Sequence, residues 1–450
     1  MDSEYFRRTH AVATEGIRRH THEDIASLCS VFDGNHFTIS DEFTSEGIPY
    51  YRGQDVVGNF FIEQSAPNFI TDEAFNRPYM TRSHLKRGDV LLSIIGTIGE
   101  LSLVDSNKPA TCSCKLAILR SRSIAPEYLA AVLRSKYGRL QVERLTRGAV
   151  QMGLILEDMD QLLVPLLSED IQGRIVQAVA KANRTRTQSG KMLESAEERL
   201  AAALGLGDWS PLEPLSYISA SAAVRMAGRF DSQYFMPAKT KVMKLLAALP
   251  GTTLGDVFDS VRDMVDPQKD SSLGLVRNFD VTHALEPVLD DEQEPIDFAD
   301  VGSIKKRMRH DDLAISRLRS YLKEIAIVQC SDSCPTVGSS EFIVLRPKAV
   351  DCLVSPSTLM TFLRSGPVQT ILKWCQDGSQ HPRFSESDLL AIPLPDAVRL
   401  ASAQIDGLVS KALSAREKAR ELLDAAKRAV EIAIEQDEAA ALHFLESVEA

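Results

Sequence analysis

The sequence predicts an α+β protein made of two similar halves, each a globular domain followed by one long helix. Two observations support this fold class. The chain repeats its own pattern 230 residues further on, and each half passes from short β-branched runs to a long stretch without proline. With 450 residues, the chain is also long enough for two large domains, each with its own apolar core.

The repeat is clearest in the second part of each half. Leu133-Arg134-Ser135 returns as Leu363-Arg364-Ser365. The same displacement relates three pairs of single residues, Gly148 with Gly378, Asp158 with Asp388 and Pro165 with Pro395. Residues 2–6 and 231–235, which open the two halves, match at a displacement of 229. A period this long is a whole domain with its connector, because solenoid repeats have periods of about 20–50 residues.

Short apolar runs predict the strands and shorter helices. Strands are expected at residues 37–39, 48–51, 89–95 and 115–119, and in the second half at 312–315, 324–328 and 341–345. These runs are β-branched and separated by Gly, Pro and Asp, as in a mixed sheet. Helices are expected at 126–137 and 356–365, each with proline in its first turn, and the second should stop or kink at Gly366-Pro367.

Two long helices are expected at residues 168–204 and 399–437. Their apolar residues recur in steps of three and four, the spacing of a coiled-coil seam, which Arg186 and Ser189 interrupt in the first helix. The seam residues are Ile175, Val179, Ala182, Leu193, Ala196, Leu200 and Ala203, then Ile405, Val409, Ala412, Ala419, Leu423, Ala426 and Val430. Because seams this narrow cannot bury either helix alone, we expect an antiparallel coiled coil that acts as a rigid spacer with one globular domain at each end.

These elements divide the chain into six segments. They are a first domain (1–167), the first long helix (168–204), a linker (205–228), a second domain (229–398), the second long helix (399–437) and an acidic C-terminal tail (438–450).

Composition narrows the class of protein. No apolar run reaches the ~18 residues of a membrane span, and residues 1–4 do not begin a secretory signal, so we expect a cytoplasmic protein without a membrane partner. Seven irregularly spaced cysteines complete no zinc motif and are expected to be buried or free thiols. The net charge of −11 argues against a nucleic-acid partner. However, residues 115–147 and 305–323 form one basic stretch in each half, compatible with two phosphate-binding faces or with solvated helix faces.

Known catalytic and cofactor motifs are missing from the sequence. There is no Walker phosphate loop, HExxH or GxSxG motif. Gly96-Thr97-Ile98-Gly99 follows an expected strand but lacks the third glycine and the downstream acid of a dinucleotide site. We therefore expect no catalytic residues, no cofactor and no metal.

Residues 85–99, which end in Gly96-Thr97-Ile98-Gly99, resemble the target-recognition domains of type I restriction–modification specificity subunits. The resemblance continues through Ile48-Pro49-Tyr50-Tyr51, Leu133-Arg134-Ser135 and Gly148-Ala149-Val150-Gln151, and the order of domains and helices extends it to nearly the whole chain. It implies a non-catalytic subunit with two tandem target-recognition domains that read the halves of a split site in double-stranded DNA. It also implies docking to two DNA methyltransferase subunits and to motor-nuclease (restriction) subunits, with the paired helices setting the unread spacer.

A DNA reader needs cations for phosphates and Arg, Lys, Gln or Asn side chains for base edges. Candidate DNA-binding residues of the first half are Arg52, Gln54, Lys86, Arg87, Thr97, Lys115, Arg147 and Gln151. Candidates of the second half are Arg277, Asn278, Arg309, Arg317, Arg319 and Arg383. Residues 276–280 are expected to be the counterpart of 51–55, and 319–322 the counterpart of 96–99.

Two alternatives stay open at this point. The same duplicated architecture would suit a protein-interaction scaffold that does not read DNA, and the negative net charge favours that hypothesis. The divergent loops of the second domain would also suit a domain that has lost DNA contact and serves as a docking surface. Strong salt dependence of binding to duplex DNA would separate a reader from a scaffold.

Overall fold

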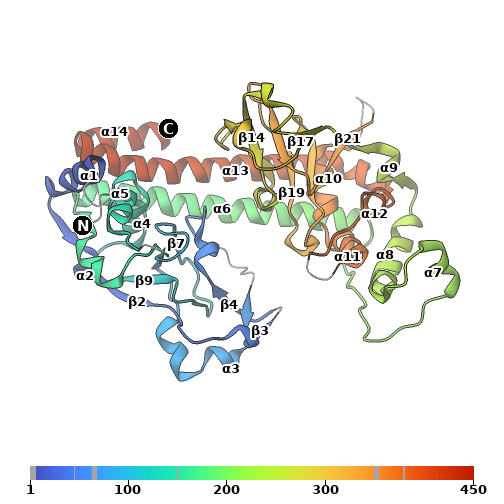
Figure 1. Cartoon of the computed structure of the whole chain (residues 1–450), viewed down its shortest axis with the longest axis horizontal. Helices are drawn as coiled ribbons and strands as arrows, with labels where there is room; N and C mark the ends of the chain where they lie inside the picture. Colours follow the sequence, from blue (N-terminus) through green and yellow to red (C-terminus); the bar gives the residue numbers. More distant parts are fainter. Residues whose placement is uncertain are drawn as a thin grey trace. The chain divides into compact units, whose positions relative to one another are not determined.

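The computed structural model describes residues 7–44, 46–62, 68–148, 152–348, 354–378 and 381–449. The chain forms two compact units. Unit 1 comprises residues 1–187 and 415–450, and unit 2 comprises residues 188–414. The division falls inside both long helices, α6 (Glu169–Ala203) and α13 (Asp396–Glu435), so each helix contributes to both units (Figure 1). The predicted α+β class is confirmed.

An antiparallel sheet in the order β2-β9-β6-β7 forms the centre of unit 1. Its strands are β2 (Cys29–Asp33), β9 (Leu116–Ser121), β6 (Asp89–Ser93) and β7 (Leu101–Leu103). Every residue of β6 is buried. Val90 and Leu92 point to a cluster shared with the helices, whereas Leu91 points to a second cluster, as strand alternation requires.

A second sheet of unit 1 has the order β3-β5-β4-β8 and is built from very short strands. They are β3 (Phe43–Thr44), β5 (Phe69–Ile70), β4 (Ile48–Tyr51) and β8 (Thr111–Cys112), with β4 and β8 parallel. A separate ladder pairs β1 (His22–Asp24) with β10 (Leu163–Pro165). The α-helices of this unit that precede α6 are α1 (Arg8–Arg18), α2 (Ile25–Leu28), α3 (Asp72–Phe75), α4 (Pro126–Arg134) and α5 (Lys136–Leu145).

Unit 2 repeats the first sheet in the same strand order. β12 (Phe258–Ser260), β21 (Phe342–Pro347), β18 (Leu313–Ser316) and β19 (Ile325–Val328) take the places of β2, β9, β6 and β7, with β15 (Val288–Leu289) added at the edge. β11 (Gly251–Thr253) and β22 (Pro393–Pro395) repeat the β1–β10 ladder. The accompanying helices are α8 (Pro237–Ala247), α9 (Leu254–Val257), α10 (Pro356–Arg364), α11 (Gly366–Cys375) and α12 (Glu386–Leu390).

The second sheet of unit 2 differs from that of unit 1. Its order is β13-β17-β20-β14-β16. The strands are β13 (Met264–Val265), β17 (Lys305–Met308), β20 (Thr336–Ser339), β14 (Leu275–Phe279) and β16 (Ile296–Asp297). The parallel pair β14–β20 matches β4–β8, and β16 lies beside β14 as β5 lies beside β4. The difference is that β17 and β13 continue the sheet beyond β20, whereas β8 is the last strand of its sheet.

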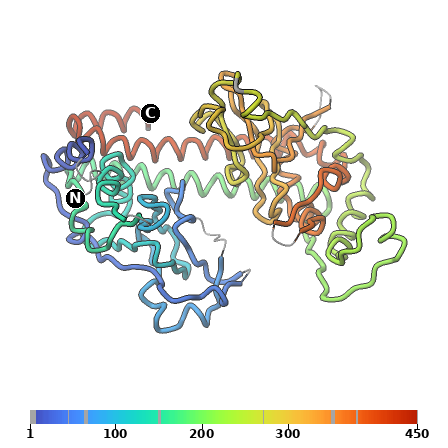
Figure 2. The backbone as a smooth tube through the Cα atoms, viewed as in Figure 1, coloured from blue at the N-terminus to red at the C-terminus, as the bar shows by residue number. Residues whose placement is uncertain are grey.

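The two long helices pack against each other within each unit, in opposite chain directions, as predicted (Figure 2, α6 in green and α13 in orange to red). In unit 1, Ala182 of α6 packs with Ala419 and Leu422 of α13. In unit 2, Ala196 and Leu200 share a core with Ile405 and Val409. Most seam residues are buried, but Ala203 is exposed.

Ser189 and Arg186, the two polar residues that interrupt the seam, both have interaction partners. Buried Ser189 donates a hydrogen bond from Oγ to the carbonyl of Ala412 at 2.7 Å within unit 2. Arg186, in unit 1, pairs with Asp105 at 3.0 Å and lies over the ring of Phe61. Buried polar groups with partners cost far less than orphaned ones, so the seam tolerates them.

Two local predictions need correction. Residues 37–39 form no strand and lead into a 3-10 turn at Ser40–Glu42. The helix expected at 126–137 breaks at Ser135, whose side chain caps α5. In the second half α10 ends at Arg364 and α11 begins at Gly366 with Pro367 in its first turn, so the stop predicted at Gly366-Pro367 is confirmed. The linker contains α7 (Ser221–Ala227).

The segment expected as an acidic tail forms α14 (Glu438–Glu449), which packs Ala441 and Leu445 into the core of unit 1. Glu438 accepts a hydrogen bond from the backbone N–H of Ser168 at 3.0 Å and so satisfies a donor at the start of α6. Among the residues described, no helix is long and apolar enough to cross a bilayer.

Candidate nucleic-acid interface

Four loops of unit 1 meet where β6 ends. The backbone N–H of Ile94 donates to the carbonyl of Lys115 at 2.9 Å, and Ile95 forms a β-bridge with Gly153. Thr97 Oγ1 donates to the carbonyl of Gly53 at 2.9 Å. We call this surface loop end 1 and define it as residues 52–56, 94–100, 113–115, 146–148 and 152–154.

Loop end 1 brings together five of the candidate residues: Arg52, Gln54, Thr97, Lys115 and Arg147. Gln54, Lys115 and Arg147 are exposed. The Arg147 side chain is 55% exposed although it pairs with buried Asp158. Thr97 is only half-buried and its hydroxyl, 2.9 Å from Ser93 Oγ, ties the loops together. Gln151 lies outside the described residues.

Arg52 occupies the N-cap position of a 3-10 turn at Gly53–Val56. Its backbone N–H donates to Asp55 Oδ2 at 2.7 Å, which fixes where the chain leaves β4. Burial raises the pKa of the Asp55 carboxyl, while this hydrogen bond and the Arg52 charge oppose the rise. The capping turn therefore sets the position of Arg52 at the edge of loop end 1.

Lys86 and Arg87 are exposed but precede β6, whereas loop end 1 follows it. Five residues at about 3.3 Å each separate the two ends of that strand by roughly 16 Å. Arg309 likewise precedes β18. The backbone N–H groups of Lys86 and Arg309 each donate to the aspartate that follows three residues later, Asp89 and Asp312, at 2.7 Å.

Unit 2 has the same meeting of loops where β18 ends. The backbone N–H of Arg317 donates to the carbonyl of Glu341 at 3.1 Å, as Ile94 does to Lys115. Leu318 forms a β-bridge with Arg383, as Ile95 does with Gly153. We call this surface loop end 2, defined as residues 280–285, 317–323, 339–341, 377–378 and 381–384.

The backbone pairing corrects the expected counterpart of residues 51–55. Tyr51 pairs with Cys112 in a parallel ladder, and Phe279 pairs with Gly338 in the equivalent one. The residue after each is an N-cap, so Arg52 corresponds to Asp280 rather than to Arg277. Arg277 lies inside β14, is only 9% exposed and pairs with Asp291 at 3.1 Å. Partly buried Asn278 follows it in the same strand.

Charge reverses at three equivalent backbone positions of the loop ends. Unit 1 has Arg52, Lys115 and Arg147, whereas unit 2 has Asp280, Glu341 and Asp377. The backbone bridge from Arg147 to Gly153 matches that from Asp377 to Arg383, which fixes the third correspondence. The same frame therefore presents opposite charge in the two halves.

Loop end 2 has its own cations in an ion-pair cluster. Arg383 donates from Nη2 to Glu341 Oε1 at 2.7 Å and from Nε to Glu341 Oε2 at 3.0 Å, and its Nη1 donates to the carbonyl of His381 at 2.9 Å. Arg317 Nε lies 3.5 Å from the same carboxylate. Arg383 lowers the pKa of Glu341 below its ordinary value, so the carboxylate is charged and holds the guanidinium in place.

Two further cations lie beside this cluster. Lys306 Nζ donates to the carbonyl of Phe342 at 2.6 Å, and Arg262 pairs with Glu386 at 2.9 Å. Burial lowers the pKa of Lys306, and the nearby charges of Arg317 and Arg262 lower it further, while Glu386 opposes the shift.

The turn after β18 has an unusual backbone. Arg319 (φ 43°) and Lys323 (φ 52°) are both left-handed, at the places where unit 1 has Gly96 (φ 85°) and Gly99 (φ 87°). Residues with a Cβ adopt this region at a cost, and such strain gathers at functional sites. The loop shape is therefore kept in unit 2 while its glycines are replaced by cations.

Sequence reasoning missed the acids of loop end 2, above all Glu341. A signal is present in the sequence, because residues 115–119 and 341–345 are both β-like runs. Aligning the first residue of each run would have placed Glu341 opposite Lys115. Asp280 and Asp377 carry no such signal, because the strand register decides their positions.

Other chemistry is not assembled in the part of the chain that the structure describes. No group of three or more His, Cys, Asp or Glu side chains there is arranged to hold a metal ion. Six cysteines are free thiols, and burial raises the pKa of Cys29, Cys330 and Cys375 to about 11. Such thiols are protonated at neutral pH and are poor nucleophiles or ligands. Cys352 lies outside the described residues.

No protein-family model and no curated protein matches the sequence. Among solved structures, the chain is similar to a type I restriction-modification S subunit from M. genitalium, with 14% identity, 91% of this chain and 95% of that chain covered, and a TM-score of 0.39. It is also similar to an HsdS subunit from Thermoanaerobacter tengcongensis, with 17% identity, coverage of 93% and 97%, and a TM-score of 0.30.

A third similar structure comes from work on complex assembly and conformational transition of the type I R-M system, with 15% identity, coverage of 93% and 97%, and a TM-score of 0.30. At these identities and TM-scores the likeness does not reach individual residues. The roles of residues in this chain are therefore inferred from their own surroundings.

Proposed function

We propose that this chain is the DNA-sequence specificity subunit of a type I restriction–modification system. In this proposal it has no catalytic activity of its own and reads a bipartite site in double-stranded DNA, one half-site with each unit. One observation carries the proposal. Two units share a backbone frame down to individual hydrogen bonds, yet the loops at the end of the frame present different polar side chains. Two readers of unlike half-sites need that combination of constant scaffold and variable loops.

Loop end 1 suits a contact to DNA in which phosphates contribute much of the affinity. Arg52, Lys115 and Arg147 lie on one surface, and exposed Gln54 stands beside Arg52. Lys and Arg neutralise phosphates and release counterions, while Gln reads adenine by two hydrogen bonds in the major groove. We infer that these cations fix the register of unit 1 on its half-site and that Gln54 contacts a base.

Loop end 2 suits a more selective contact, in which Arg383 reads guanine. Glu341 occupies the Nε and Nη2 side of the guanidinium, and one donor of Nη1 goes to the carbonyl of His381. An arginine has five N–H donors, so donors of Nη1 and Nη2 stay available for the O6 and N7 acceptors of guanine. Because Glu341 already holds the Arg383 guanidinium in place, the side chain loses less conformational entropy when it binds guanine.

The proposed partners are two DNA methyltransferase subunits and, in a complete system, restriction subunits. The structure similar to this chain that concerns complex assembly of the type I R-M system makes such partners a reasonable proposal. One surface of unit 2 also favours a protein partner. Large apolar side chains of the linker and of the residues just after it are almost fully exposed, namely Leu215, Ile218, Met226 and Phe230.

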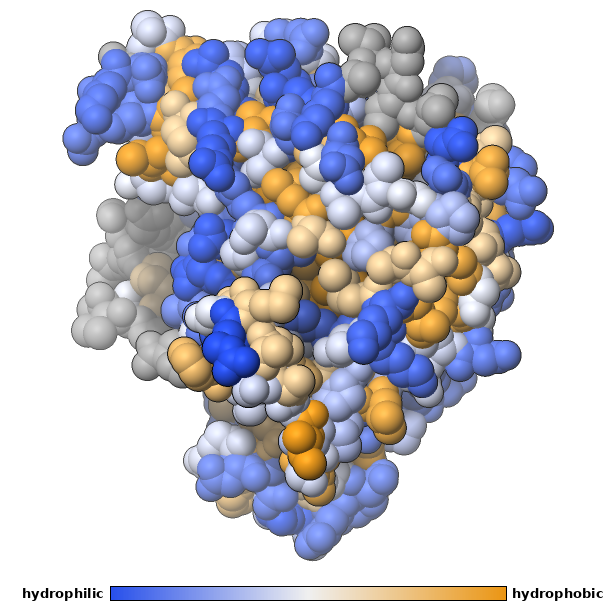
Figure 3. All heavy atoms as spheres, turned by 90° about the vertical axis from the view of Figure 1, so that its right-hand side faces the viewer, coloured by the Kyte–Doolittle hydropathy of each residue, from blue (hydrophilic) through white to orange (hydrophobic). Residues whose placement is uncertain are grey.

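The same apolar surface favours the second candidate function, a protein-interaction scaffold that does not read DNA. Figure 3 shows the side of the molecule on which α7 lies in Figure 1, with apolar residues in orange among hydrophilic residues in blue. A scaffold would need this surface but not the cations of loop end 1. Binding to duplex DNA therefore separates the two functions.

The test uses the full chain, with its methyltransferase if the two co-purify, and duplexes that carry the site found by mapping genomic methylation. Arg52→Asp with Lys115→Glu places in unit 1 the residue types that unit 2 carries at those positions. Each lost phosphate contact should reduce the slope of log K against log salt by about 1, so we expect a slope smaller by about 2.

The matched control is Lys86→Glu with Arg87→Asp, an equal change of charge at the other end of β6. It should leave the slope within about half a unit of the wild type. Binding to DNA that does not depend on salt in the wild-type chain would reject the proposal in favour of a scaffold. Equal losses from both double variants would show that net charge, rather than loop end 1, drives binding.

A further inference from the structure

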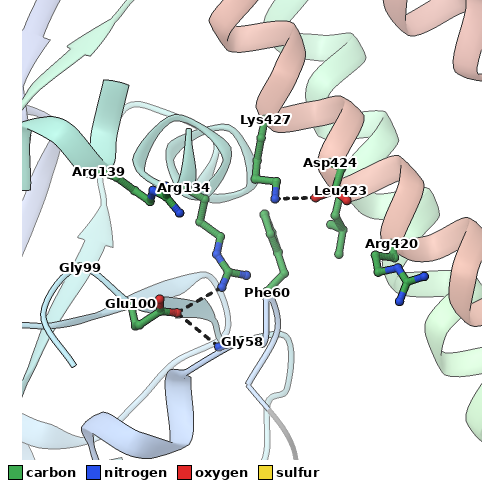
Figure 4. Close-up of a pocket in the computed structure, with 10 residues that line it drawn as sticks. All are labelled: Gly58, Phe60, Gly99, Glu100, Arg134, Arg139, Arg420, Leu423, Asp424 and Lys427. Atoms are coloured by element: carbon green, nitrogen blue, oxygen red, sulfur yellow. Dashed lines mark hydrogen bonds and ion pairs between the residues drawn. The ribbon is translucent and has the colours of Figure 1, made fainter. Parts of the chain in front are cut away.

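Unit 1 contains a pocket between its sheet domain and the C-terminal half of α13, which shares Gly99 and Glu100 with loop end 1 but none of the candidate DNA-binding residues (Figure 4). Its volume is about 190 Å³. The residues that line it come from two loops (Gly58 and Phe60; Gly99 and Glu100), from α4 and α5 (Arg134 and Arg139) and from α13 (Arg420, Leu423, Asp424 and Lys427). Four cations therefore face two carboxylates across one small space.

Arg134 is the central group of this pocket. Its side chain is 17% exposed, lies 5.6 Å from the centre of the Phe60 ring and meets Glu100 only at 3.7 Å. Among the residues described, no hydrogen bond to its guanidinium is found. Burial lowers the pKa of Arg134, Glu100 opposes that shift, and the charge of Arg139 adds to it. Burying the Arg134 guanidinium with so few partners and so little water costs free energy unless an anion binds beside it.

The equivalent arginine of unit 2 has ample partners, which shows that the fold itself does not demand this arrangement. Arg364 donates to the carbonyl of Ile325 at 2.7 Å and 3.0 Å and also reaches the carbonyls of Ala284 and Leu285. The 230-residue repeat places Gln369 opposite Arg139 and Glu197 opposite Lys427. The cationic pocket is thus a property of unit 1 alone.

We propose that this pocket binds a phosphate group, held by Arg134 and Arg139 on one side and by Lys427 on the other. Two guanidinium forks and an ammonium match the charge and the planar faces of a phosphate better than those of a single carboxylate. A volume of about 190 Å³ is below the roughly 300–1,000 Å³ of pockets that enclose a whole drug-sized ligand. The site therefore takes one phosphate group rather than an entire nucleotide.

The phosphate group could come from free inorganic phosphate or from the backbone of DNA. In either case the ligand ties α4 and α5 to α13 within unit 1, because its cations come from both sides. Lys427 is now engaged by Asp424 at 2.5 Å, and this neighbouring carboxylate is the group that phosphate has to displace. The inference goes beyond the proposed function, since it does not require that loop end 1 reads DNA.

The test measures binding of inorganic phosphate to the full chain by calorimetry and by thermal unfolding, with chloride at equal ionic strength as reference. In the wild type, phosphate should bind saturably and raise the melting temperature where chloride does not. Arg139→Gln with Lys427→Glu introduces the residue types found in unit 2 and should weaken phosphate binding at least tenfold. Arg18→Gln with Lys108→Glu makes the same changes on the exposed surface of unit 1 and should leave it within twofold.

Arg139→Gln alone, a change at an exposed side chain, serves as a second variant if the double variant does not fold, and it should weaken binding at least threefold. Equal effects of phosphate and chloride on the wild type, or unchanged affinity in these variants, would overturn the proposal. Competition between duplex DNA and phosphate would identify a backbone phosphate as the source, and simultaneous binding would identify free phosphate. The Arg52→Asp, Lys115→Glu variant should keep its affinity for phosphate, so failure of the proposed function is distinguishable from failure of this site.

Discussion

Unit 1 and unit 2 resemble each other at one end of the central sheet and differ at the other end. At the start of β6 and of β18, the two units are nearly identical. Arg120 donates hydrogen bonds from Nε and Nη2 to the Asp89 carboxylate at 2.8 and 2.7 Å. Arg346 donates from the same two atoms to the Asp312 carboxylate, both at 2.7 Å. At the other end of these strands the backbone is the same but the charges are reversed. What both units keep is what the fold requires, and what differs is available for recognition.

The second sheets extend this comparison. Both units keep one parallel pair, β4–β8 or β14–β20, because that pair leads directly into the loop ends. The strands added around it differ in number and in the side on which they pair. Variation is thus greatest in the sheet that supports the loops, while the sheet that packs on the helices keeps its four-strand order and gains only β15 at the edge.

The largest expected effect comes from breaking the shared ion pair. Asp89 and Asp312 are each 1% exposed, so Asp89→Ala or Asp312→Ala leaves a guanidinium and a backbone N–H without their acceptor. Each substitution should lower the free energy of unfolding of its own unit by roughly 3 kcal/mol. Urea unfolding measures this loss. A loss confined to one of the two variants would contradict the claim that the pair is a common element of the frame.

The next largest effect is expected at Arg383, which Glu341 holds in loop end 2. Arg383→Gln should reduce discrimination for a guanine in the second half-site by about 1–3 kcal/mol, measured as relative affinity for duplexes that differ at one base pair. Glu341→Gln should relax the same discrimination to a smaller degree, because Arg383 is then present but less firmly held. Arg262→Gln removes an exposed cation near the cluster and serves as control. Loss of discrimination in the first half-site instead would refute the division of labour.

A smaller effect should appear with pH. Arg383 keeps the folded-state pKa of Glu341 below its ordinary value of 4.5, whereas in the unfolded chain the group titrates near that value. The stabilisation is therefore complete above about pH 4.5 and is lost as the pH falls toward the folded-state pKa. The difference in unfolding free energy between wild type and Glu341→Gln should shrink over that range. A difference that stays constant between pH 6 and the acid limit would count against a charged Glu341.

Removing the cations that precede β6 and β18 should have the smallest effect, because we expect DNA affinity and stability to stay nearly unchanged. Lys86→Ala, Arg87→Ala and Arg309→Ala remove exposed cations at the far end of β6 or β18, roughly 16 Å from loop end 1 along β6 and roughly 13 Å from loop end 2 along β18. Each should alter DNA affinity at fixed salt, and stability, by less than about 0.5 kcal/mol. Titration with the cognate duplex checks this. A loss above tenfold would move the proposed interface to the opposite end of the sheet.

Many elements were predictable because their signals are local. The β-like runs at 89–95, 312–315 and 324–328 became β6, β18 and β19, and the long helices differ from the expected ranges by at most three residues. The candidate site was less predictable. Lys115 and Arg317 lie at the loop ends, whereas Arg277 is buried in a strand, since an arginine in a short apolar run does not reveal its register.

The duplication, the α+β class and the two long helices could be predicted without a structure, because periodicity, proline placement and repeated residues act within one stretch of chain. Which loops meet and which charges face each other depends instead on how distant segments pair and pack in three dimensions. Arg52 corresponds to Asp280 because β4 and β14 pair with strands about 60 residues away along the chain. Glu341 holds Arg383 across 42 residues for the same reason. Contacts between distant segments depend on strand register and packing, and no local pattern encodes them.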